Sequence, residues 1–227
     1  PGMGWLGMSW LTRGPAWLSV VALCVGLFVL RLVYLRFVCP YELAEDEAFY
    51  WEWSQHLAWS YNTKGPGIAW AIGFSTWLFG TSEFGVRAVA AFAGLIGSVA
   101  TGAMALELTG GNRKAGLFAA VVYPIIPAFG ATAVLSTIDG PYLACWAVAC
   151  WAMVRAVKCN SPVAWAMIGW AIGVGFMFKY TILLLPLGFV LAWVMSRRAG
   201  IKGAEIGLRP GAMGLAGMVL GLLVGML

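Results

Sequence analysis

The chain has 227 residues, of which 62% are hydrophobic and only 10% are charged, and it contains 13 Trp and 30 Gly. Its mean hydropathy of +0.87 excludes a soluble globular domain and indicates a polytopic membrane protein. The net charge of +5 gives no reason to expect a nucleic-acid partner. The five cysteines show no C-x-x-C spacing, so we expect small core residues rather than a metal site or a disulfide framework.

Membrane spans are predicted wherever about 20 mostly apolar residues follow one another. We expect the first to be an uncleaved anchor, and the short fifth and sixth could tilt or break around Lys179. The last lacks a polar flank, so we expect the chain to be truncated at its C-terminus. The prediction is an all-α polytopic membrane protein, with about seven transmembrane helices in one domain (1–227) and a helical bundle over 84–227. The predicted spans are 16–37, 84–106, 115–133, 139–157, 162–178, 180–196 and 211–227.

The charges are unevenly distributed between the predicted loops. Seven of the nine acids fall on one side of the predicted membrane, while nine of the 14 cations fall on the other. The positive-inside rule makes the cation-rich side cytoplasmic, so the acids face outward. These nine cations are Arg13, Arg113, Lys114, Arg155, Lys158, Arg197, Arg198, Lys202 and Arg209.

The outer segment 39–83 is the only long connection, so function is expected there. Residues 46–57 predict an amphipathic helix, because Phe49, Trp53 and Leu57 share one face. Residues 68–79 are apolar, but at about 1.5 Å per residue they are too short to cross a membrane. We therefore expect two interfacial helices in this loop.

An acidic cluster opens the first of these helices, with Glu45, Asp46, Glu47 and Glu52 lying within eight positions. A carboxylate at a dry interface becomes more basic, so Asp46 or Glu47 could serve as a general base. The alternative is that these acids lie on a solvated surface and only stabilise the start of the helix through its dipole. The sequence implies no cofactor with certainty, although a divalent metal bound by these acids is possible.

A candidate phosphate site lies in the segment 61–67, which contains Tyr61 and Lys64. A lysine beside the start of a helix can bind a phosphate, and the alternative is a turn with a snorkelling lysine. Arg87, near the outer end of its span, is costly there unless it is paired or functional. Asp139 could cap its helix or belong to a site, and Lys179 could bind an anion or merely break a hairpin.

Several segments together resemble the GT-C glycosyltransferases of bacteria, the protein mannosyltransferase-like and lipid A aminoarabinose transferase-like enzymes. The similarity covers roughly residues 20–190, the front half of such enzymes. Thr63 departs from their pattern, because many of them have an acid before the Lys or His position. The matching segments are 46–58 (DEAFYWEWSQHLA), 64–70 (KGPGIAW), 78–87 (LFGTSEFGVR), 136–141 (STIDGP) and 178–181 (FKYT).

This resemblance implies an integral-membrane glycosyltransferase that moves a sugar from a polyprenyl-phosphate carrier to an acceptor hydroxyl. It implies a multi-pass protein of the bacterial inner membrane with a periplasm-facing site. Asp46 matches the catalytic aspartate and Asp139 a second acid of the site. Lys64 and Arg87 match positions that face the lipid phosphate.

Two other functions are compatible with the same residues. A transferase-like fold could serve as a non-catalytic scaffold subunit among other membrane subunits, which the short chain and its 13 Trp favour. A transporter for a lipid-linked sugar would use the same phosphate-binding site but would need no general base. Membrane lipids are expected partners in every case.

Overall fold

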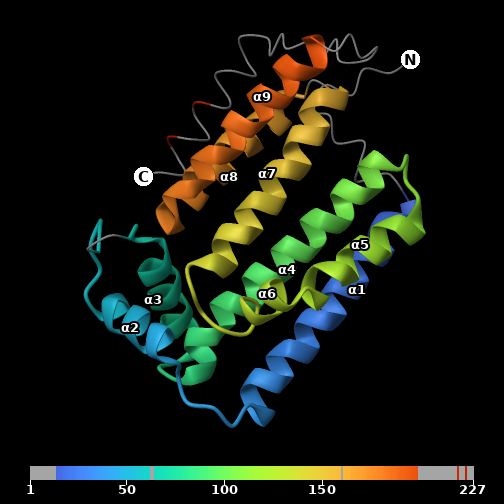
Figure 1. Cartoon of the computed structure of the whole chain (residues 1–227). Helices are drawn as coiled ribbons and strands as arrows, with labels where there is room; N and C mark the ends of the chain where they lie inside the picture. The colour runs from blue at the N-terminus through green and yellow to red at the C-terminus, as the bar shows by residue number, and fades with distance from the viewer. Residues whose placement is uncertain (1–13, 62–63, 160, 199–218, 220–222, 224–227) are drawn as a thin grey trace.

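The computed structural model describes residues 14–61, 64–159, 161–198, 219 and 223, and Figure 1 shows their arrangement. Within these residues the chain is helical and has no strand, only an isolated bridge between Tyr61 and Lys64. The predicted all-α class is therefore confirmed for the described part of the chain. The elements are α1 (Gly14–Val33), the π-helical turn η1 (Tyr34–Val38), α2 (Glu45–Gln55), α3 (Gly67–Phe79), α4 (Glu83–Leu108), α5 (Arg113–Ile125), α6 (Pro127–Ala131), α7 (Asp139–Cys159), α8 (Pro162–Phe178), the 3₁₀ turn η2 (Tyr180–Leu183) and α9 (Leu184–Arg198).

Three helices among the described residues are long and apolar enough to cross a membrane: Gly14–Val38, Glu83–Leu108 and Asp139–Cys159. They match the predicted spans 16–37, 84–106 and 139–157. The predicted span 211–227 lies outside the described residues, apart from 219 and 223. The total of about seven spans thus stays a prediction.

The predicted continuous span 115–133 is wrong, because the helix is divided. α5 ends at Ile125, Ile126 is extended (φ −61°, ψ 120°), and α6 begins at Pro127. A proline disfavours helical backbone in the residue before it, which explains the break. A second break separates α8 from η2 at Lys179 (φ −152°, ψ 122°), at the position where the sequence had left a tilt or a break open.

The outer segment folds into α2 and α3, close to the two predicted helices. α2 buries Glu47, Tyr50 and Ser54, whereas Phe49 and Leu57 of the predicted apolar stripe are 48% and 62% exposed. An apolar face that points away from the protein suits a helix at a membrane interface. The orientation of α2 and α3 toward the membrane stays a prediction.

The central helix is α4, which packs against α1, α5 and α7. Its small residues allow this close approach, as in other membrane helix pairs. A Cβ on Gly97 would overlap the ring of Tyr123, and one on Gly102 would overlap Val20. These contacts hold the second half of α4 closely against α5 and α1.

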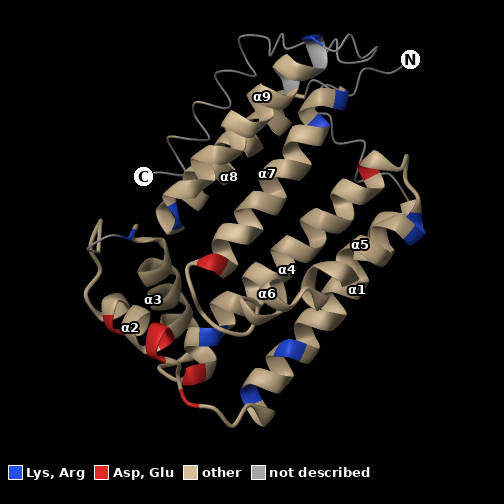
Figure 2. Ribbon diagram, viewed as in Figure 1, with Lys and Arg blue, Asp and Glu red and all other residues tan. Residues whose placement is uncertain are grey.

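Figure 2 shows that acidic residues gather at the α2 end of the molecule, together with several cations, whereas the opposite ends of α5 and α7 carry mainly cations. At that opposite end Arg155 forms a buried ion pair of 2.7 Å with Glu107. Lys158 donates to the Glu107 carbonyl. The acids of the outer segment and the cations at the ends of α5 and α7 thus lie at opposite ends of the molecule, and which of these ends faces outward stays a prediction.

Candidate functional site at the acid-rich end

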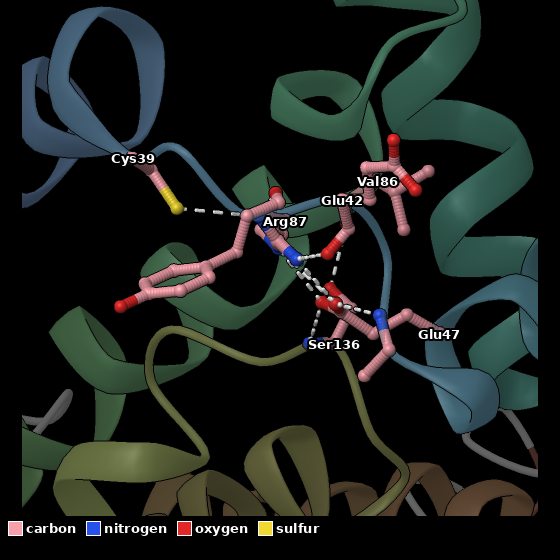
Figure 3. Close-up of polar contacts among 8 residues, drawn as sticks. Cys39, Glu42, Glu47, Val86, Arg87 and Ser136 are labelled. Carbon is pink, nitrogen blue, oxygen red and sulfur yellow. Dashed lines mark hydrogen bonds and ion pairs between the residues drawn. The ribbon is translucent and has the colours of Figure 1, made fainter.

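A buried ion pair between Glu47 and Arg87 joins α2 to α4 (Figure 3). The Arg87 Nη2 lies 2.8 Å from Glu47 Oε2, and the side chains are 3% and 0% exposed. Glu47 is in the first turn of α2, where its carboxylate also accepts from the Ala44 backbone N–H at 3.0 Å. This contact is the glutamate half of a capping box, so the same residue starts the helix and anchors it.

All five N–H groups of Arg87 have acceptors. Nε and Nη2 donate to Glu47. Nη1 donates to Cys39 Sγ (3.3 Å) and the Tyr41 carbonyl (2.8 Å), and Nη2 also to the Glu42 carbonyl (2.7 Å). In this arrangement no N–H of Arg87 is left for a lipid phosphate. The expectation that Arg87 faces the phosphate has no support in this geometry.

Ser136 brings a third segment to the ion pair. Its backbone N–H donates to Glu47 Oε1 at 2.9 Å, and its hydroxyl donates to the Val86 carbonyl at 2.6 Å. Ser136 is fully buried, and three residues later α7 begins with Asp139. The ion pair therefore sets the position of Asp139 as well as that of α2. With both its oxygens occupied and no exposure, Glu47 is a structural group here rather than an accessible base.

Asp46 precedes Glu47 on α2 but is exposed. Asp46 and Asp139 both influence the Tyr50 phenol. Burial raises the pKa of this phenol, and the negative charges of Asp46 and then Asp139 raise it further. Asp46 and Tyr50 are one helical turn apart on α2, while Asp139 comes from α7. Tyr50, to which the sequence analysis gave no role, is thus close enough to both predicted acids to respond to their charges.

A second ion pair at this end is open to solvent. Lys179 Nζ lies 2.8 Å from Asp139 Oδ1, and the side chains are 40% and 42% exposed. The same ammonium lies 5.6 Å from the centre of the Tyr142 ring, and the Thr181 hydroxyl donates to the Tyr142 hydroxyl at 2.9 Å. The structure therefore brings together two predicted site residues, and adds Tyr142 and Thr181, which sequence reasoning did not single out.

The Lys64 segment packs against the end of α8. Gly65 lies so close that any side chain there would overlap the Met177 carbonyl, two residues before Lys179. Lys64 is partly exposed, and its ammonium has no hydrogen bond or ion pair with the described part of the chain. Among the described residues, Lys64 is thus a cation without an internal ion-pair partner, in the segment that packs near the Lys179 end of α8.

Tyr61 closes the end of α2. Its hydroxyl accepts from the Ala58 N–H at 2.7 Å and lies 2.8 Å from the His56 carbonyl, to which it donates. Its ring stacks on Trp53 with centroids 4.7 Å apart. The hydroxyl is thus bonded within the protein and one ring face is covered by Trp53. Only the edge of the ring could serve the substrate-binding role that was predicted for Tyr61.

No metal centre is evident in the described residues, because no three His, Cys, Asp or Glu side chains among them could hold an ion.

Taken together, the fold and site define an integral membrane protein with a charged cluster held at the end of a helical bundle. The chain belongs to the dolichyl-phosphate-mannose-protein mannosyltransferase family, whose model matches residues 63–221. This match covers Lys64, Arg87, Asp139 and Lys179 but not Asp46. It confirms the class to which the sequence motifs pointed.

The chain is also similar to the lipid A galacturonosyltransferase RgtD of Rhizobium johnstonii. The two are 25% identical over 189 residues, which are 83% of this chain and 39% of that relative. The chain thus spans well under half of the relative's length. No solved structure matches the chain.

Proposed function

We propose that the protein transfers a sugar from a polyprenyl-phosphate carrier to an acceptor hydroxyl at the acid-rich, outer end of the bundle. The observation that carries the proposal is the contrast between two adjacent carboxylates on α2. Glu47 is buried and fully bonded, while Asp46 is held beside it and exposed. A rigid anchor next to an accessible carboxylate is the arrangement that a general base needs.

In the proposed reaction the Asp46 carboxylate takes the proton of the acceptor hydroxyl. The acceptor oxygen attacks the anomeric carbon of the sugar, and the bond from that carbon to the phosphate oxygen breaks. The phosphate leaves with the electron pair and stays on the polyprenyl chain. Attack opposite to the leaving group inverts the configuration of the sugar.

Charge builds on the phosphate as the bond breaks, so nearby cations accelerate the step. Lys64 is the first candidate, because its ammonium has no partner in the described residues. Lys179 is the second, because its ion pair with Asp139 is about half exposed and can exchange partners. Arg87 then has a positioning role, since it holds α2, α4 and the 136–139 segment in place.

The relative in Rhizobium johnstonii is a bacterial transferase whose name gives lipid A as its substrate. This supports the placement of our protein in a bacterial inner membrane as a multi-pass protein with a periplasm-facing site. The identity of the sugar and of the acceptor is open to experiment with the same assay.

The test is transfer of a labelled sugar from a polyprenyl-phosphate donor by the full-length protein in liposomes. Asp46→Asn keeps the shape of the side chain but not its basicity, and should lower turnover by about 10²–10⁴ while carrier binding changes little. Glu52→Gln is the matched control, because Glu52 is also an exposed acid of α2. Its turnover should stay at the wild-type level.

Two results would contradict the proposal. An active wild type with an equally active Asp46→Asn variant removes the base assignment. A wild type inactive with every donor, yet stably bound within a larger membrane assembly, favours the scaffold function.

A further inference from the structure

A polar pocket lies at the acid-rich end of the bundle, between η1 with the segment that follows it and the start of α4. Its volume is about 270 Å³. Arg87 and Cys39, which are bonded to each other, form part of its wall (Figure 3). Neither Asp46, Asp139 nor Lys179 lines it, so the pocket is not part of the proposed transfer site.

Three charged side chains line this pocket: Arg36, Glu42 and Glu83. None of them forms a side-chain hydrogen bond or an ion pair with the described part of the chain. The guanidinium of Arg36 lies 5.8 Å from the centre of the Phe84 ring, a cation–π contact that orients the cation without using its N–H groups. The pocket therefore offers one cation and two carboxylates that keep their hydrogen-bonding capacity for a ligand.

The pocket lies at the boundary of two membrane-spanning helices. Arg36 is two residues from the end of the span Gly14–Val38, and Glu83 is the first residue of the span Glu83–Leu108. The hydrocarbon core of a bilayer ends at this level, where the phosphate and amine groups of lipids begin. Phe37, beside Arg36 on η1, is 79% exposed and offers apolar surface to an acyl chain. The surroundings of the pocket therefore suit a phospholipid.

We propose that this pocket binds the headgroup of phosphatidylethanolamine, a lipid ligand other than the sugar carrier. The lipid phosphate lies at Arg36, and the ammonium group lies between the carboxylates of Glu42 and Glu83. Hydrogen bonds between charged groups are roughly twice as strong as those between neutral ones. The inference does not depend on transferase activity.

Charge complementarity separates this lipid from other common phospholipids. Phosphatidylglycerol brings a phosphate to Arg36 but no cation for the two carboxylates, which repel its negative charge. Phosphatidylcholine has the right charges, but its quaternary ammonium has no N–H to donate to a carboxylate. Only the ethanolamine headgroup matches both halves of the pocket.

The bound lipid also supports the segment that holds Arg87. Cys39 Sγ and the carbonyls of Tyr41 and Glu42 all accept from Arg87, while the side chain of Glu42 lines the pocket. Glu42 thus joins the lipid to the buried ion pair. A ligand that binds only the folded state stabilises it, so phosphatidylethanolamine should raise the Tm.

The test measures thermal unfolding of the full-length protein in detergent with added lipids of identical acyl chains. Phosphatidylethanolamine should raise the Tm by about 5 °C, and phosphatidylglycerol and phosphatidylcholine clearly less. Arg36→Met should remove the response to phosphatidylethanolamine and leave the Tm without lipid unchanged, because Arg36 is exposed. Arg113→Met is the matched control and should keep the response, because Arg113 is an exposed arginine at the start of α5 that does not line the pocket.

A double variant tests the acidic half of the pocket. Glu42→Gln combined with Glu83→Gln keeps the size of both side chains and removes both charges. It should lose the preference for phosphatidylethanolamine over phosphatidylglycerol, a change that a merely structural role of the two acids would not cause. In the wild type, successive N-methylation of the headgroup should lower the Tm rise in steps, because each methyl group removes one N–H donor.

Four results would overturn the proposal. An equal Tm rise with all three lipids makes the effect a general one of added lipid. A full response in Arg36→Met removes the phosphate site, and an unchanged preference in the double variant removes the ammonium site. Equal stabilisation by glycerophosphoethanolamine, which carries the same headgroup without acyl chains, overturns the assignment to a membrane lipid.

Discussion

Two ion pairs lie at the same end of the molecule, and they differ in their exposure to solvent. Glu47–Arg87 is 0% and 3% exposed, whereas Asp139–Lys179 is 42% and 40% exposed. In both pairs the closest nitrogen and oxygen are 2.8 Å apart. The distance between charges therefore does not tell which pair is structural and which is available to a ligand.

The surroundings of the two pairs explain the difference. The buried pair is enclosed by the Ala44 and Ser136 N–H groups and the carbonyls of Tyr41 and Glu42, so every polar atom is matched. Loss of either partner leaves a buried charge uncompensated. The exposed pair is screened by solvent and worth little to stability, which leaves Lys179 free to exchange a carboxylate for a phosphate.

The largest effect is expected from breaking the buried pair. Arg87→Met leaves Glu47 charged and buried, and should lower the free energy of unfolding by about 3–5 kcal/mol. Thermal unfolding in detergent measures the loss. The control is Arg36→Met, because Arg36 is an exposed arginine at the same end. If Arg87→Met unfolds like the wild type, the pair is not the anchor of α2.

The sequence predicted much of this end of the molecule. The acid-rich start of α2 and the short apolar α3 were both recognisable, and the charge between two apolar runs made a break at Lys179 one of the alternatives. The break at Ile126 was missed because an apolar count over 115–133 ignored Pro127. That proline was a usable signal.

The bonding of the site could not be predicted in the same way. Glu47 and Arg87 were both named, but the two residues are 40 positions apart in the sequence, and Ser136 is 89 positions from Glu47. A charge in a sequence gives no measure of how many donors or acceptors surround it after folding. Only the fold distinguishes the two adjacent acids: the carboxylate of Glu47 is buried and fully hydrogen-bonded, whereas Asp46 is exposed.

A smaller effect, on binding rather than stability, is expected from the exposed pair. Lys179→Met removes one charge-assisted contact to the phosphate, worth about 1.5–3 kcal/mol, so affinity for the carrier should fall about 10–100-fold. Unfolding should change by no more than about 1 kcal/mol. Equilibrium binding of labelled polyprenyl phosphate and thermal unfolding are measured on the same samples. Unchanged affinity would make Asp139–Lys179 a second structural pair.

The smallest effect concerns Tyr50, a buried residue of α2 whose phenol responds to the charges of both Asp46 and Asp139. Burial and then the charges of Asp46 and Asp139 raise the pKa of its phenol above the ordinary value of about 10. The folded state therefore holds the phenolic proton more tightly than the unfolded state does. The resulting stability is fully present below the unfolded pKa and is lost as the pH rises through the higher folded pKa.

Tyr50→Phe should remove this alkaline loss and leave stability at neutral pH nearly unchanged. Subtracting the tyrosinate absorbance of the Tyr50→Phe variant from that of the wild type gives the titration of Tyr50. Asp46→Asn and Asp139→Asn should each move that titration to lower pH, because each removes one negative charge that opposes ionisation. If Asp139→Asn has no effect while Asp46→Asn does, the two acids do not share one electrostatic environment. Asp139 would then belong with Lys179 alone, and the base and the exposed ion pair would act as separate parts of the site.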